Sequence, residues 1–164
     1  MALPAKPTRP TSGLRSKTYV GAPGLDVATL VVAGKLLKIA REDSFELTAG
    51  EIDATGRGST WRKYIQGLKE GSVPLTMLYH PDRPGFKLLR EAYDSGDAVS
   101  YGMFDEYGYG FIMDGIVTAF SMNRPLEDVV TCSVTLRPTD YPTTADPDGR
   151  EPTWVEPSSQ GGSS

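Results

Sequence analysis

The side chains that most often carry chemistry are scarce in this sequence. It has one histidine, His80, and one cysteine, Cys132. Catalysis by a Cys–His couple needs both groups exposed and close together, whereas Cys132 alternates with apolar residues on the inward side of a predicted strand. A metal site with several His and Cys ligands is impossible with one of each. We therefore expect Cys132 to be buried and unreactive, and His80 to be a structural residue at a strand end.

Three other patterns match chemical motifs only in part. Residues 56–59, Gly-Arg-Gly-Ser, lack the lysine–serine ending of a phosphate-binding loop, and no helix follows them directly. Residues 107–110, Tyr-Gly-Tyr-Gly, could stack on bases, but no basic patch accompanies them and such a pair more often packs across a hairpin. The carboxylates of Asp140, Asp146 and Asp148 fit a solvated tail better than a metal site. The sequence predicts no enzyme, no metal site and no cofactor.

Composition limits the class of protein. The 164 residues carry a formal net charge of −4, which argues against sequence-specific DNA binding because that needs a basic face. The slight excess of acid permits a surface that DNA passes without adhering. No apolar run reaches transmembrane length, the N-terminus lacks the apolar core of a signal peptide, and one cysteine excludes an internal disulfide framework. We expect assembly in the cytoplasm and no membrane partner.

Composition also divides the chain into three parts. Residues 1–24 are proline-rich, and proline favours extended backbone, so we expect an extended N-terminal arm. Residues 25–138 hold the periodic apolar patterns of one folded domain. Residues 139–164 are mostly Pro, Thr, Asp, Gly and Ser, with Trp154 and Val155 as an isolated apolar pair, which predicts a polar tail that is disordered by itself. The prolines of the N-terminal arm are Pro4, Pro7, Pro10 and Pro23.

Period-two alternation of apolar and polar residues predicts most of the secondary structure. In residues 44–53, Phe45 and Leu47 alternate with polar residues as in a half-buried antiparallel strand. Residues 25–33 fit either a strand or a short helical turn, and Asp114-Gly115 could mark a bulge. The other predicted strands are residues 16–20, 35–40, 73–79, 99–103, 109–122 and 130–136.

One helix is predicted between Asp82 and Gly96. Asp82 stands where a carboxylate favours the positive end of the helix dipole, and glycine commonly ends a helix. Its apolar stripe, which must pack on a sheet, consists of Phe86, Leu89 and Tyr93. Because strands outnumber helices and neighbouring strands are joined locally, the pattern favours a mainly β fold, an antiparallel β-sandwich or barrel with one flanking α-helix.

Four large apolar residues follow a polar, glycine-rich stretch at residues 54–60. That stretch is too flexible to pack by itself, and an extended loop offers the apolar groups little local core. They either meet a partner surface or fold back onto their own sheet. The four are Trp61, Tyr64, Ile65 and Leu68, with Arg62, Lys63 and Lys69 among them.

The same region resembles the major tail tube proteins of long-tailed, siphovirus-like bacteriophages. In that family an (I/V)-D-x-T strand end leads through a long loop to an aromatic and basic segment ending in G-L-x-(D/E)-G. This sequence has Ile52-Asp53-Ala54-Thr55, then a Gly/Ser-rich gap, then Trp-Arg-Lys-Tyr-Ile-Gln-Gly-Leu-Lys-Glu-Gly at residues 61–71. The expected turn at residues 67–71 is the most specific part, and the resemblance covers residues 34–138.

The resemblance implies a structural virion protein. Six copies would form a ring, stacked rings would form the hollow tail tube, and the inner strands of the six subunits would join into one barrel. The long loop would reach the neighbouring ring. Partners would be further copies of the chain, a tape-measure protein, tail terminator and tail-tip proteins, and viral DNA crossing the lumen. The location would be the virion tail, after assembly in the host cytoplasm.

Two sets of residues are candidates for these contacts. The loop residues that would meet another subunit are Trp61, Arg62, Tyr64, Ile65 and Leu68. The acidic residues that would line the lumen are Glu46, Glu51 and Asp53; negative charge there would let phosphate slide rather than adhere. The alternative is that these three are ordinary solvated strand residues. Two other functions stay open: a secretion-type tube ring, which shares the fold, and a monomeric β-sandwich binding module.

Overall fold

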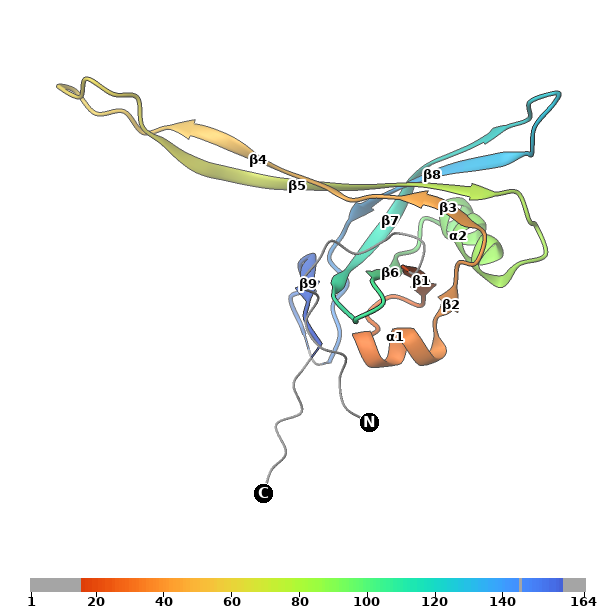
Figure 1. The fold of residues 1–164 in the computed structure, drawn as a ribbon. Helices are drawn as coiled ribbons and strands as arrows, with labels where there is room; N and C mark the ends of the chain where they lie inside the picture. The colour runs from red at the N-terminus through yellow and green to blue at the C-terminus, as the bar shows by residue number, and fades with distance from the viewer. Residues whose placement is uncertain (1–15, 145, 158–164) are drawn as a thin grey trace.

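Nine antiparallel strands and two helices make up the described part of the chain (Figure 1). The computed structural model describes residues 16–144 and 146–157. The strands are β1 (Lys17–Gly21), β2 (Lys35–Leu36), β3 (Ala40–Asp43), β4 (Glu46–Asp53), β5 (Tyr64–Leu78), β6 (Val99–Phe104), β7 (Gly110–Asn123), β8 (Thr131–Pro138) and β9 (Thr153–Val155). The helices are α1 (Val27–Ala33) and α2 (Pro84–Ser95). The strand order is β2-β1-β6-β7-β8-β5-β3, with β4 paired to β5 and β9 paired to β7.

The main core lies on one face of this sheet, where alternation directs every second side chain inward. The buried residues of β5 and β8 are Val73, Leu75, Met77, Cys132, Val134 and Leu136. The helix α2 adds Phe86, Leu89 and Ala92 to the same cluster. A second, small cluster joins Leu30 of α1 to Phe104 and Ile112. The mainly β, antiparallel fold and the inward side of the last long strand are thus confirmed.

The strand β5 is longer than the sheet that flanks it. Its residues 73–78 pair with β8, whereas its residues 64–72 pair with β4 alone. That two-stranded ribbon, with its connecting loop at residues 54–63, extends away from the body, and the β7–β8 hairpin extends in the opposite direction (Figure 1). We call the ribbon and its loop the long arm. Residues 119–123 of β7 pair with β8 on one side, while β6 pairs with β7 only up to Gly115, so both projections carry strand edges without a partner among the described residues.

Four expectations about the strands are wrong. Residues 67–71 form no turn, because β5 continues through them. Residues 35–40 are not one strand, since the chain turns between β2 and β3. β4 is not half-buried, because all eight of its residues are exposed. The irregularity in β7 falls between Val117 and Ala119 rather than at residues 114–115.

Gly67 shows why a glycine in this region does not mark a turn. A Cβ there would lie 3.2 Å from the carbonyl oxygen of Gly50 and 3.3 Å from Cγ1 of Ile52. The glycine therefore allows β4 and β5 to approach closely at an irregular point of their pairing, a common use of glycine inside a strand.

The helices agree with the sequence in part. Residues 25–33 contain a helix, which begins after Asp26, whose carboxylate accepts from the Thr29 N–H at 2.7 Å. In α2 the buried positions Phe86 and Leu89 are as expected, but Tyr93 is 47% exposed, and Arg83 rather than Asp82 occupies the N-cap, without a side-chain hydrogen bond. None of the helices in the described ranges has the length and apolar character needed to cross a membrane.

The C-terminal segment returns to the sheet. β9 pairs with β7, Trp154 lying opposite Phe111, and Arg150 donates to Oδ1 of the buried Asp114 at 2.8 Å. The expectation of a disordered tail is therefore wrong for residues 150–155, because a buried ion pair and a strand hold them. The domain limits drawn at residues 24 and 138 stay a prediction.

Candidate assembly surfaces

Glu46 and Glu70 lie on one face of the long arm, and Glu51 and Asp53 lie on the other. Successive residues of a regular strand alternate between faces, and directly opposite residues of an antiparallel pair share a face. Glu70 was missed by the sequence analysis. The pairs are Glu46 with Ser72, Thr48 with Glu70, Glu51 with Gln66 and Asp53 with Tyr64. We call the side with Glu46, Thr48, Glu70 and Ser72 the acidic face.

A local irregularity in β5 changes the character of the two faces along the arm. Between the pairs Ala49 with Lys69 and Glu51 with Gln66, β4 has one residue, Gly50, and β5 has two, Gly67 and Leu68. The extra residue of this bulge is therefore on β5, where it reverses the alternation, whereas β4 alternates regularly. The three acids grouped from the sequence thus do not share one face. Beyond the bulge, the side of the acidic face carries Ile52 and Ile65 instead.

The charge of Asp53 is reinforced locally. Hydrogen bonding from the side chain of Thr55, and from its backbone N–H to Oδ1 of Asp53 at 2.8 Å, lowers the pKa of the Asp53 carboxyl below its usual value. The group is therefore ionised at neutral pH. The carboxylates of Glu46, Glu51, Asp53 and Glu70 are all exposed.

The side of the long arm opposite the acidic face is apolar near the body. Leu47 is 48% exposed there, with Ala49 on the same side. On β5 this side leads directly into the core, because Val73 and the odd-numbered positions after it are buried. We call Leu47 and Ala49 the apolar face. Ile52 and Ile65, 51% and 56% exposed, lie beyond the bulge on the side of the acidic face. A two-stranded ribbon is marginally stable alone in water, so exposed apolar side chains on such a ribbon indicate a partner.

The acidic face continues over the body as a polar surface. The outward positions of β8 and the residues beside them on β7 are small and polar, because the alternate positions fill the core. They are Ser121, Asn123, Thr131, Ser133, Thr135 and Arg137. Within this set and the acidic face, Arg137 is the one basic residue against two carboxylates, Glu46 and Glu70.

The expected contact residues are exposed but do not form one surface. Trp61 and Arg62 lie in the loop of the long arm, Trp61 with 80% of its surface exposed. Tyr64, Ile65 and Leu68 belong to β5 rather than to the loop. Ile65 lies on the side of the acidic face, Tyr64 on the opposite side, and Leu68 at the bulge. None of them folds back onto the sheet of its own chain, so their contact role stays a prediction.

A second exposed apolar group lies at the end of the β7–β8 hairpin. The sequence analysis missed it because residues 123–125 indicated only a turn. Leu126 is 98% exposed, with Met122 and Val129 at 46% and 51%. Both projections therefore end in apolar side chains.

The side chains that could take part in catalysis or metal binding lie apart from one another. Cys132 is buried as expected, and burial raises the pKa of its thiol. His80 is exposed at the end of β5. Among the described residues, no three His, Cys, Asp or Glu side chains are grouped so that they could hold a metal ion.

One buried polar cluster ties the C-terminal segment to the body. Oδ1 of Asp114 accepts hydrogen bonds from Ser100 Oγ at 2.9 Å, from the Gly24 N–H at 2.9 Å and from Arg150 Nη2 at 2.8 Å. Arg150 also donates to the carbonyl oxygen of Leu25. These bonds join three separate segments, which is a structural role.

No protein-family model and no curated protein matches this sequence. Solved structures do match by fold. The tail of an empty gene transfer agent particle, refined with C6 symmetry, matches with a TM-score of 0.65 and 12% identity over 80% of this chain and 96% of the other. The SPP1 tail tube matches with a TM-score of 0.65 and 17% identity over 79% and 76% of the two chains. The sheath–tube complex of an extracellular contractile injection system matches with a TM-score of 0.54 and 11% identity over 80% and 89%.

These likenesses show that the chain has the tail tube fold. This is the fold expected from residues 52–71, and it includes the long β4–β5 hairpin. Phage tubes, a gene transfer agent tail and an injection-system tube all have it, so the fold does not choose among them.

Proposed function

We propose that this chain is the ring subunit of a phage-like tail tube, in which copies join side by side and rings stack into a hollow tube. The observation that carries the proposal is the two-sided long arm. Near the body, one side is charged and solvated, as a water-filled lumen requires, and the other carries apolar side chains that stay exposed among the described residues. A tube subunit needs both kinds of surface, one toward the lumen and one toward its neighbours.

The shape of the subunit supports ring closure. The long arm and the β7–β8 hairpin project in opposite directions and are different surfaces (Figure 1). Contact between different surfaces of identical copies is heterologous, and such contacts close into a ring or continue as a filament. Pairing of the free strand edges between neighbours would also remove the hazard that exposed edges present. We take six as the number of copies, since the similar gene transfer agent tail has C6 symmetry.

In this ring the acidic face lines the lumen. Glu46 and Glu70 would repeat around the channel and repel phosphates, so that DNA passes without binding. Glu51 and Asp53, which the sequence grouped with Glu46, face the other side of the arm. The channel would hold a tape-measure protein during assembly and conduct viral DNA afterwards. Terminator and tip proteins would close the two ends of the tube in the virion tail.

The runner-up is a tube of a secretion or contractile injection system, favoured by the similarity to such a sheath–tube complex. The acidic face favours DNA as cargo, because the carboxylates of Glu46 and Glu70, repeated around one channel, oppose adhesion of a polyanion. A monomeric binding module is disfavoured, since it would leave the apolar face of a two-stranded ribbon in water.

Light scattering over a range of protein concentrations, followed by electron microscopy, tests the proposal. We expect a monomer that gives way to rings and tubes as concentration rises or when tail-tip proteins are added. A species that stays monomeric under all these conditions would contradict it.

A further inference from the structure

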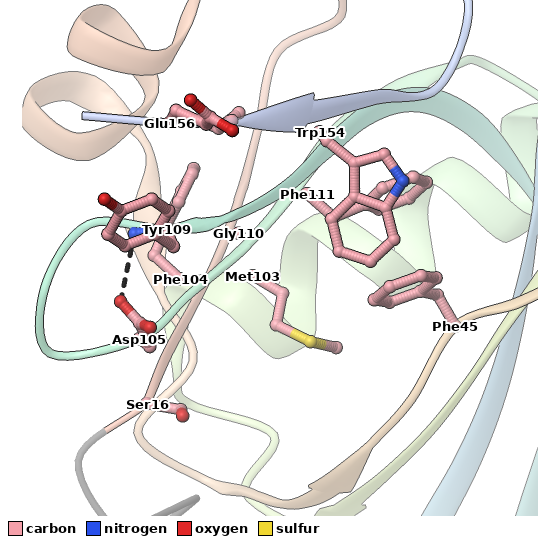
Figure 2. Close-up of a pocket in the computed structure, with 11 residues that line it drawn as sticks. Ser16, Phe45, Met103, Phe104, Asp105, Tyr109, Gly110, Phe111, Trp154 and Glu156 are labelled. Atoms are coloured by element: carbon pink, nitrogen blue, oxygen red, sulfur yellow. Dashed lines mark hydrogen bonds between the residues drawn. The ribbon is translucent and has the colours of Figure 1, made fainter. Parts of the chain in front are cut away.

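We propose that a groove beside β9 binds the proline-rich segment at residues 4–10 of the same chain. The groove has a volume of about 430 Å³ and lies between β9, the β6–β7 turn and the root of the long arm. Aromatic side chains make up much of its lining: Phe45, Phe104, Tyr109, Phe111 and Trp154. Figure 2 shows Trp154, Phe111 and Phe45 together at one side of it, with Met103 beside them.

The aromatic end of the groove is ordered and open. The rings of Phe45 and Phe111 stack with centroids 4.5 Å apart, and Trp154 meets Phe45 edge-on at 4.9 Å. Even so, 63% of the surface of Trp154 is exposed. An indole held in place by two rings and still exposed is a surface ready for an apolar ligand.

The charge of the groove is one-sided. Its charged lining residues are Asp105 and Glu156, and it has no lysine or arginine. Oδ1 of Asp105 accepts hydrogen bonds from the N–H groups of Tyr107 and Tyr109, which holds that carboxylate at the rim. The groove therefore fits a ligand that is both apolar and basic.

Residues 1–15 have this composition. They contain three basic residues, Lys6, Arg9 and Arg15, and no acidic residue. Residues 4–10 are Pro-Ala-Lys-Pro-Thr-Arg-Pro. In a polyproline II helix, which has three residues per turn, the prolines would share one edge and Lys6 and Arg9 another. Proline-rich segments of this pattern bind grooves lined by aromatic rings.

Chain connection selects this segment as the occupant. Ser16, where the described residues begin, itself lines the groove. Residues 11–15 can span at most about 17 Å, so the tether keeps residues 4–10 near the groove, and a short tether gives an intramolecular ligand a high effective concentration. Residues 1–15 lie outside the described residues. The inference does not depend on ring formation.

A disulfide between introduced cysteines tests the contact. In the full-length chain, Lys6→Cys with Glu156→Cys should form an intrachain disulfide under mild oxidation, seen as a monomer that migrates faster without reductant. The native Cys132 is buried and does not compete. The matched control is Lys6→Cys with Val32→Cys, because Val32 is 86% exposed on α1 and outside the groove. We expect the control pair to oxidise at least tenfold more slowly.

Alanine in place of Pro4, Pro7 and Pro10 should lower the oxidation rate of the Lys6→Cys, Glu156→Cys protein to that of the control pair. Ala5→Ser with Thr8→Ser changes the third edge of the polyproline II helix and should leave the oxidation rate unchanged. Equal rates for the two cysteine pairs, or a rate that is unaffected by the proline changes, would overturn the proposal. Disulfide-linked dimers from a mixture of the two single-cysteine chains would overturn it too, because the segment would then occupy the groove of a second copy.

Discussion

At the scale of residues, strand pairing decides where the charges of the long arm point. The extra residue of the bulge lies on β5, so β4 alternates regularly and Glu46 faces one way while Glu51 and Asp53 face the other. Thr55 holds Asp53 ionised. The sequence identified these three acids as a group, but period-two alternation separates them. Glu70 joins Glu46 through its pairing with Thr48, so the acidic face is a product of strand pairing.

Reversing two of these charges should change how the assembled tube treats DNA. In tubes of Glu46→Lys with Glu70→Lys, a short DNA duplex should be retained at low salt and released as salt rises, because fixed cations in a channel bind phosphate. The control is Glu91→Lys with Asp94→Lys on the exposed side of α2, which changes the net charge equally. Retention by both variants would show that the acidic face does not line the lumen.

At the scale of elements, the secondary structure of a segment was predictable from the sequence where one of its sides is buried in the core, because burial fixes the spacing of its apolar residues. β8 and the apolar stripe of α2 follow their periodicity because one side of each is buried. The long arm was not predictable in the same way. Its glycines suggested a turn, although in the structure they allow two strands to approach. All residues of β4 are exposed, so burial among the described residues does not specify the pattern of the arm.

The core side of α2 can be tested by truncation. Leu89 is fully buried between the helix and the sheet, so Leu89→Ala should lower the free energy of unfolding by about 2–5 kcal/mol. Tyr93→Ala, on a residue that is about half exposed, should cost clearly less. Chemical denaturation of the monomer measures both, and equal losses would show that the helix packs otherwise.

The loop of the long arm should affect assembly and leave the fold intact. Trp61 is 80% exposed, so Trp61→Ala removes little from the folded monomer, yet a tryptophan central to a contact often contributes about 2 kcal/mol or more. We expect an unchanged melting temperature and loss of tube growth. Tubes of normal length in electron micrographs would show that this loop does not join rings.

At the scale of the whole molecule, the subunit is stable at its centre and incomplete at its ends. The buried core, α2 and the Asp114–Arg150 ion pair hold the body together. The two projections instead offer free strand edges and exposed apolar side chains in opposite directions. That distribution suits a subunit whose body folds before assembly and whose two projections become covered only by neighbouring subunits.

The two faces of the long arm should therefore differ in their effect on ring closure. Leu47 and Thr48 are neighbours on β4, both exposed, and they lie on the apolar and the acidic face respectively. Leu47→Asp and Thr48→Asp add the same charge to the same strand, and neither removes a buried group, so the melting temperatures should stay close together. Leu47→Asp should keep the protein monomeric, because a carboxylate would have to be buried against the neighbouring subunit. Thr48→Asp should still form rings, since it adds one more acid to a solvated surface. Light scattering of the two variants at equal concentration separates these outcomes, and a monomeric Thr48→Asp beside a ring-forming Leu47→Asp would show that the acidic face is the one that meets the neighbour.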